Sequence, residues 1–130
     1  MTNPVKIFRL KDFQKTELPL AVWKTTLNDL HDTRHRHDCY EMLFLSSGAG
    51  WSAINDRHFP MVKGDLFLMT PDDFHEAMLD NSTFFYNILF SEDLLRSCGT
   101  ELYESVQRLF SGSRKLAFPL ETGIKLENIL

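Results

Sequence analysis

Short stretches rich in β-branched and aromatic residues follow one another from residue 20 to residue 90, with turn-forming residues between them. Runs of this length separated by Gly, Pro, Asn or Asp are typical of strands joined by tight turns. The predicted strands are LAVWKTTL (20–27), CYEMLFLSS (39–47), WSAIN (51–55), RHFPMV (57–62), LFLMT (66–70), HEAML (75–79) and FFYNILF (84–90). The spacing predicts an all-β barrel or sandwich, with Asn55-Asp56 as a hairpin turn.

After residue 90 the strand pattern gives way to a helix pattern. Ser91 suits an N-cap, and Glu92 and Asp93 are favourable in the first turn of a helix. Gly99-Thr100 is expected to divide the segment into two helices, with Thr100 as the second cap, and Gly112 to end it. Apolar side chains recur at helical spacing at Leu94, Cys98, Leu102, Val106 and Leu109/Phe110. Leu94, Leu102, Val106 and Leu109 indicate helix packing on the barrel or a dimer interface.

Composition excludes several classes of protein. The chain has 130 residues, 43% of them apolar, which is one domain with enough apolar surface for a core. The 18 acidic residues outnumber the 14 basic ones without any basic run, so direct contact with nucleic acid is not expected. Cys39 and Cys98 are isolated thiols, which suits a reducing cytoplasm. We see no signal peptide and no apolar run long enough for a membrane helix, and expect a cytoplasmic protein without membrane contact.

The stretch HRHDCYE (35–41) places two histidines and a glutamate at odd positions. If the chain is extended from residue 35 to residue 45, His35, His37 and Glu41 share a face with Leu43 and Leu45, which belong in the core. A carboxylate and two imidazoles inside a barrel cost several kcal/mol unless each is paired. The sequence offers no nucleophile with its base, no phosphate-cradling glycine loop and no CxxC pair.

This pattern resembles the cupin superfamily. His35-x-His37-x-x-x-Glu41, then six residues and Gly48, follows the first cupin motif, and Gly64 and His75 follow the second, with Pro71 one place late. Positions 29, 73 and 79 depart from the family pattern, as Asp29, Asp73 and Leu79. The resemblance implies a double-stranded β-helix in which His35, His37, Glu41 and His75 form a 3-His-1-Glu set for Zn, Ni, Fe or Mn.

The overall layout is similar to the N-terminal effector-binding and dimerisation domain of AraC-type transcription regulators. Gly48-Ala49-Gly50, then GDLFLMTPDDFHEA, then a strand ending in Phe90-Ser91-Glu92 and a helical tail carry the resemblance. It implies an N-terminal arm (1–18), a cupin barrel (19–90) and a helical dimerisation or linker segment (91–130). It also implies a homodimer, with DNA bound by helix-turn-helix units that lie beyond Leu130 and are absent from this chain.

Three uses of the His/Glu set remain open at this stage. The set can hold a metal ion, form a polar floor for a small metabolite such as a saccharide, or consist of histidines that satisfy each other. Trp23 and Trp51 are candidates for stacking on a ligand, although core packing is the commoner role of tryptophan. The favoured function is a small-molecule sensing and dimerisation domain. The alternatives are a metal-dependent cupin enzyme, such as an oxygenase or isomerase, and a dimerisation module without a ligand.

Overall fold

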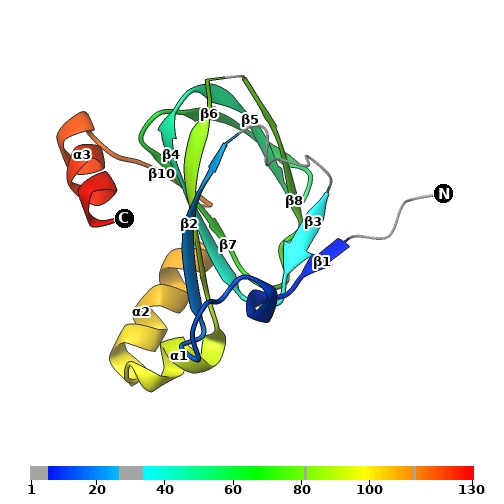
Figure 1. Ribbon diagram of the computed structural model, residues 1–130, viewed down its shortest axis with the longest axis vertical. Coiled ribbons are helices and arrows are strands. Elements are labelled where there is room, and N and C mark those ends of the chain that lie inside the picture. Colours follow the sequence, from blue (N-terminus) through cyan, green and yellow to red (C-terminus); the bar gives the residue numbers. More distant parts are fainter. Residues whose placement is uncertain (1–5, 27–33, 81, 113) are drawn as a thin grey trace.

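The structure is a computed structural model that describes residues 6–26, 34–80, 82–112 and 114–130. Within these residues, ten strands form two five-stranded sheets that face each other as a barrel (Figure 1). The strands are β1 (Lys6–Phe8), β2 (Leu20–Thr26), β3 (His35–His37), β4 (Tyr40–Ser47), β5 (Ala49–Ile54), β6 (Arg57–Val62), β7 (Asp65–Met69), β8 (His75–Leu79), β9 (Phe84–Phe90) and β10 (Lys115–Ala117). The predicted β-barrel followed by short helices is confirmed.

The two sheets share the chain in an alternating way that is characteristic of a double-stranded β-helix. One sheet has the order β1-β3-β8-β5-β6, and the other has the order β10-β7-β4-β9-β2. Paired strands are antiparallel, except for β1 and β3, which run parallel. The β5–β6 hairpin lies within one sheet, but β3 and β4, which are also adjacent in sequence, lie in different sheets. Side chains from both can meet in the space between the sheets.

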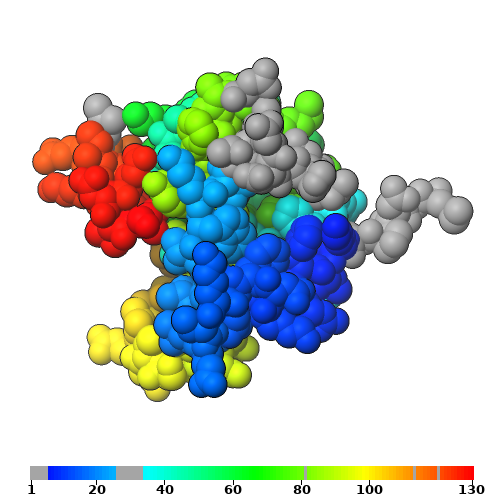
Figure 2. All heavy atoms as spheres, in the orientation of Figure 1, coloured from blue at the N-terminus to red at the C-terminus, as the bar shows by residue number. Residues whose placement is uncertain are grey.

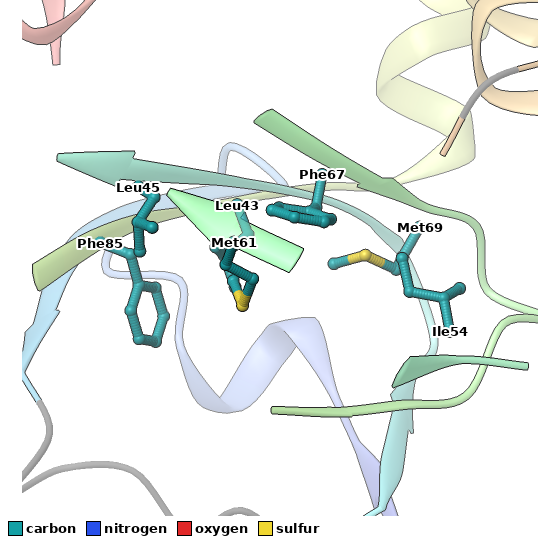
Figure 3. Packing of buried hydrophobic residues seen from close by; sticks show 7 residues of the cluster. All are labelled: Leu43, Leu45, Ile54, Met61, Phe67, Met69 and Phe85. Atoms are coloured by element: carbon teal, nitrogen blue, oxygen red, sulfur yellow. The ribbon is translucent and has the colours of Figure 1, made fainter. Parts of the chain in front are cut away.

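Alternation along the strands separates an interior cluster from an outer one. Leu43 and Leu45 on β4 point into the barrel, as their odd positions predicted, and pack with Phe67 and Phe85 (Figure 3). Burying a side chain of this kind stabilises the fold by roughly 1.5–3 kcal/mol. The outer cluster, on the opposite face of the same sheet, is covered by helices and contains Tyr40, Phe44, Leu66, Leu68, Leu95 and Phe110.

The predicted hairpin turn at Asn55-Asp56 joins β5 to β6. Both residues have positive φ, 50° and 67°. Two successive residues in the left-handed region characterise the tight turn that matches the twist of a hairpin, and Asn and Asp tolerate this region better than most side chains. The dipeptide Asn55-Asp56 therefore predicted the position of the turn and the residues that form it.

Three helices follow or flank the barrel: α1 (Glu92–Ser97), α2 (Thr100–Ser111) and α3 (Leu120–Ile129). Ser91 caps α1 as predicted, since its side-chain oxygen accepts the backbone N–H of Leu94 at 3.0 Å. The prediction that Thr100 caps the second helix is wrong. Gly99 occupies the N-cap of α2 with φ of 106°, a conformation that glycine adopts without steric cost, and Thr100 is the first helical residue. Cys98, expected in the apolar stripe, is exposed.

The segment before β2 crosses the barrel in the blue region at the front of Figure 2. It contributes β1, which pairs with β3, and a 3₁₀ helix at Leu10–Asp12. The backbone N–H of Leu10 donates to Asp38 Oδ1 at 2.8 Å, and the Leu10 side chain is buried with Ala21, Cys39 and Leu89. We call residues 6–13 the arm. It is held by the β1–β3 pairing, the hydrogen bond to Asp38, the buried Leu10 side chain and the ring contacts of Phe8 and Phe13.

The chain between α2 and α3 returns to the barrel. β10 extends the second sheet beside β7. Arg114, just before this strand, and Lys115, its first residue, pair with buried acids. Arg114 contacts Asp73 at 2.7 Å, and Lys115 Nζ lies 3.2 Å from Asp65. The sequence predicted a barrel at 19–90 and a helical segment at 91–130. Within that second segment, residues 115–117 form a strand of the barrel sheet. No helix within the described residues is long and apolar enough to cross a membrane.

Candidate functional site

A corner in the chain brings the His/Glu set together. His35 and His37 lie on β3 in one sheet, and Glu41 lies on β4 in the other, with a bend at Asp38-Cys39 between them. The chain is therefore not extended throughout from residue 35 to residue 45, the condition under which the sequence placed these side chains on one face. The three side chains still converge, because the bend turns the chain from one wall of the barrel to the opposite wall. His75 on β8 is the direct strand partner of His35.

The four side chains form a compact cluster. Glu41 Oε2 lies 2.6 Å from His37 Nε2 and 3.1 Å from His75 Nε2. The ring centres of His35 and His75 are 4.2 Å apart. One ligand atom from each of the four residues lies within 4.8 Å of all the others. Three of the residues are buried, and His35 is partly exposed.

Several polar atoms of this cluster have no hydrogen-bond partner. They are His37 Nδ1, His37 Nε2, Glu41 Oε2 and His75 Nε2, all buried. The short Nε2–Oε2 contacts bring these atoms together without hydrogen-bond geometry. His37 Nδ1 takes part in neither contact, and a buried polar atom left without a partner costs roughly 1–3 kcal/mol. Converging imidazole nitrogens and a carboxylate oxygen form a donor set that suits a divalent transition metal, so the residues fit such an ion.

Electrostatics keep Glu41 ionised and Cys39 neutral. Burial by itself raises the pKa of Glu41, but attraction to the His37 and His75 imidazoles outweighs it and holds that pKa well below its usual range. Glu41 is then a carboxylate, the form that binds metal ions. Burial, together with Asp38 and Glu41, raises the pKa of the Cys39 thiol to about 12. This thiol packs with Leu10 and Leu89, apart from the ligand set, and is not a nucleophile.

The cluster forms one end of a cavity of about 360 Å³ inside the barrel, within the range of small-molecule sites. The lining residues are Lys6, Phe8, Phe13, Trp23, Thr25, His35, His37, Glu41, Leu43, His75, Ala77, Phe85 and Asn87. The arm supplies part of the wall. The Phe8 ring meets His35 edge-on at 4.9 Å, and the Phe13 ring stacks on Trp23 at 4.9 Å and 2°.

The two candidate tryptophans lie in different places. Trp23 lines the cavity from β2. Trp51 lies on the outer face of β5, 56% exposed, beside its strand partners Pro60 and Met78. Its neighbour Ser52 is buried, so alternation along β5 turns residue 51 outward. We therefore remove Trp51 from the residues assigned to this cavity.

Sequence reasoning missed eight lining residues, of which Leu43, Ala77 and Phe85 are apolar strand residues. Lys6, Phe8 and Phe13 lie on the arm, where no periodicity marks which side chains face the barrel. Thr25 and Asn87 are buried and hydrogen-bonded to each other, with the Asn87 amide donating to the Thr25 hydroxyl. Asn87 had a detectable signal, because it is the polar residue in the apolar strand FFYNILF.

The predicted dimerisation residues do not form one uniform surface. Val106 on α2 packs against the outer cluster of the barrel. Leu102 and Leu109, on the same helix, are 48% and 43% exposed, whereas Leu94 on α1 is partly buried. The apolar stripe thus serves packing on the barrel and continues onto an exposed flank formed by Leu102 and Leu109.

Two sheets closed into a barrel around three histidines and a glutamate define a cupin. The profile of the family described as AraC-like ligand binding domain matches residues 25–117, and the chain belongs to this family. It is 27% identical over 96 residues to the HTH-type transcriptional activator RhaR of Escherichia coli strain K12, an alignment that covers 74% of this chain and 34% of that protein. The chain thus spans about a third of the length of the curated relatives it matches.

One solved structure supports this fold. ToxT from Vibrio cholerae aligns with a TM-score of 0.52 and 11% identity, over 85% of this chain and 46% of that chain. A cupin protein from Bacteroides fragilis aligns with a TM-score of 0.45 and 18% identity, over 55% of this chain and 64% of that chain. At 11% identity, the alignment with ToxT supports a shared fold and nothing more.

Proposed function

We propose that this domain binds a small polar metabolite in the barrel and acts as the sensing domain of an AraC-type transcription regulator. The observation that carries the proposal is the cavity of about 360 Å³, walled by aromatic side chains and ending at the His/Glu set. A module that only dimerises has no use for an open pocket into which three histidines and a carboxylate converge. The cavity therefore disfavours a module without a ligand.

Family membership supports the regulatory part of the proposal. The similar protein RhaR is a transcriptional activator about three times as long as the matched segment, so the proposed full protein carries its DNA-binding units elsewhere. This domain, with its net charge of −4, would not contact DNA itself. The protein would act in the cytoplasm as a homodimer, with the exposed flank of Leu102 and Leu109 in the interface.

The arm offers a way for the ligand to change the domain. Phe8 and Phe13 form part of the cavity wall, so a bound molecule contacts the arm as well as the barrel. A ligand that binds better when the arm is closed shifts the population toward that state, by no more than its difference in affinity for the two states. A displaced or closed arm would then alter what the rest of the regulator contacts.

We further propose that His35, His37, Glu41 and His75 hold a divalent transition metal such as Zn, Ni, Fe or Mn. The buried atoms without hydrogen-bond partners support this assignment. The ion would act as a Lewis acid toward an oxygen atom of the ligand. The same atoms favour the second candidate function, a metal-dependent oxygenase or isomerase, while family membership favours the sensor.

Metal titration of protein stripped with a chelator tests the site. We expect one ion per chain, a higher melting temperature with metal, and a loss of affinity of about 100-fold or more for His75→Ala or Glu41→Gln, since each removes a ligand. His58→Ala, on the exposed part of β6, is the matched control and should bind like the wild type. If His35→Ala and His75→Ala left both metal binding and small-molecule binding unchanged, the assigned site would be wrong. Turnover of a bound compound by the metal-loaded protein would favour the enzyme.

A further inference from the structure

The polar side chains that line the cavity leave few groups for a ligand. Four of them belong to the His/Glu set. Thr25 and Asn87 are bonded to each other, since the Asn87 amide donates to the Thr25 hydroxyl. Lys6 is the remaining polar lining residue. The rest of the wall, formed by Phe8, Phe13, Trp23, Leu43, Ala77 and Phe85, is mainly apolar.

This wall suits a saccharide poorly. A saccharide carries hydroxyl groups around its ring, and each hydroxyl that is buried without a hydrogen bond costs free energy. The aromatic side chains can stack on one face of a sugar, but they offer almost no acceptors for its hydroxyls. A molecule with an apolar or aromatic body and polar atoms at one end matches the distribution of polar and apolar lining better.

The charges in the cavity indicate what that polar end should be. Among the lining residues, Glu41 is the acid and Lys6 is the base, and Glu41 is engaged with the imidazoles. A divalent ion on the His/Glu set would leave the site with an excess of positive charge. Lys6 and His35 are direct strand partners, and both line the cavity. Lys6 Nζ lies 4.8 Å from the centre of the Phe8 ring, and that ring meets His35 edge-on at 4.9 Å, so the ammonium group is close to the His/Glu set. Anionic oxygens would be favoured there.

We propose that the effector is a small organic carboxylate with an apolar or aromatic body. This inference rests on the proposed function and specifies its ligand. The carboxylate faces the His/Glu set and Lys6. The body lies along the stacked pair of Phe13 and Trp23 and against Phe85. Lys6 then acts as a specificity residue that selects the acid over neutral molecules of the same shape.

Matched acid and amide pairs test the charge requirement. The probes are phenylacetate, 3-phenylpropanoate and hexanoate, each beside its carboxamide, with D-glucose and L-arabinose as saccharides. Binding is measured by calorimetry on metal-free and Zn-loaded protein. We expect an acid to bind at least about tenfold more tightly than its amide, with a larger ratio in the Zn-loaded protein, because charge-assisted contacts are about twice as strong as neutral ones.

The substitution Lys6→Gln tests whether Lys6 is the residue that selects acids over amides. It should lower the affinity for the acid about fivefold or more while leaving the affinity for the amide unchanged, since only the charge is removed. Lys11→Gln, in the 3₁₀ helix and absent from the cavity lining, is the matched control and should bind both probes as the wild type does.

The outcomes separate this inference from the function on which it rests. Binding of a saccharide with no acid preference overturns the carboxylate assignment and leaves a sensing pocket. Equal affinities for acid and amide across the series, or no binding of any acid, also overturn it. Absence of binding for every probe and for Zn overturns both the carboxylate assignment and the proposed function.

Discussion

Asp73 stands where the second cupin motif has its inner glycine, and the structure explains this departure. Its carboxylate accepts the backbone N–H of Thr70 at 2.7 Å and the amide of Asn55 at 2.7 Å. It also pairs with both terminal nitrogens of Arg114, at 2.7 and 3.1 Å. The residue is 3% exposed and lies two positions before His75. Asp73 therefore fixes the loop that delivers His75 to the site.

Removing Arg114 should destabilise the domain. Arg114→Ala leaves the buried Asp73 carboxylate without its cation. We expect the free energy of unfolding to fall by about 3 kcal/mol, which is at the low end for a broken buried ion pair because Arg114 is partly exposed. Urea unfolding measures the change. Arg108→Ala, an exposed arginine on α2, should alter the unfolding free energy by less than about 0.5 kcal/mol. Equal effects of the two substitutions would contradict the role assigned to the Arg114–Asp73 pair.

At the scale of elements, the apolar side chains of α2 divide into a group that packs on the barrel and a group that is exposed. Tyr103, Val106 and Phe110 pack on the outer face of the barrel sheet. Leu102 and Leu109 extend this stripe onto the exposed flank. Helical spacing alone could not divide the stripe between these functions, because residues at i, i+4 and i+7 share a face whatever covers that face.

Charges on the exposed flank of α2 should prevent dimer formation. The double substitution Leu102→Glu and Leu109→Glu places carboxylates in the proposed apolar interface, and we expect at least a tenfold weaker dimer, since burying an unpaired charge is costly. Sedimentation equilibrium measures the association. Arg108→Glu changes the net charge by the same amount on the same helix, outside the flank, and should leave association nearly intact. A dimer insensitive to the double substitution would place the interface elsewhere.

At the scale of the whole molecule, the arm and β10 tie both ends of the described chain to the barrel. β1 pairs with β3 beside the His/Glu set, and β10 pairs with β7 on the other sheet. The cavity is therefore bounded by residues from the start of the chain, while α2 packs on the outer face of the barrel sheet and Arg114 and Lys115 pair with acids of the barrel. A molecule bound in the cavity would therefore touch the arm directly.

The hydrogen bond between Leu10 and Asp38 should hold the arm against the barrel. Asp38→Ala removes the acceptor of the Leu10 N–H. Losing a hydrogen bond worth about 1 kcal/mol should speed amide exchange in residues 6–12 about fivefold and weaken ligand binding by a similar factor. Hydrogen exchange followed by mass spectrometry reads the arm directly. Asp72→Ala, an exposed carboxylate in the β7–β8 turn, is the control, and unchanged exchange in Asp38→Ala would show that Asp38 does not hold the arm.

The sequence alone determined the parts of this protein that follow local rules. Strand periodicity and turn residues predicted the positions of β2 and β4 to β9, Asn55-Asp56 predicted its hairpin, and Ser91 predicted the start of α1. Motif spacing also brought together His35, His37, Glu41 and His75 as candidates, and the structure places them in one cluster. Each of these signals depends on residues within a few positions of one another, or on a family pattern.

Only the tertiary structure decided what surrounds that cluster. Trp51 turns outward while Trp23 lines the cavity, and Lys6, Phe8 and Phe13 reach it from an arm without periodicity. Asp73 meets Arg114 across 41 positions of sequence. These contacts depend on how the two sheets close and on where the arm crosses them. Such long-range packing leaves no period or spacing in a single sequence, because the partners are set by the closed barrel and not by their neighbours in the chain.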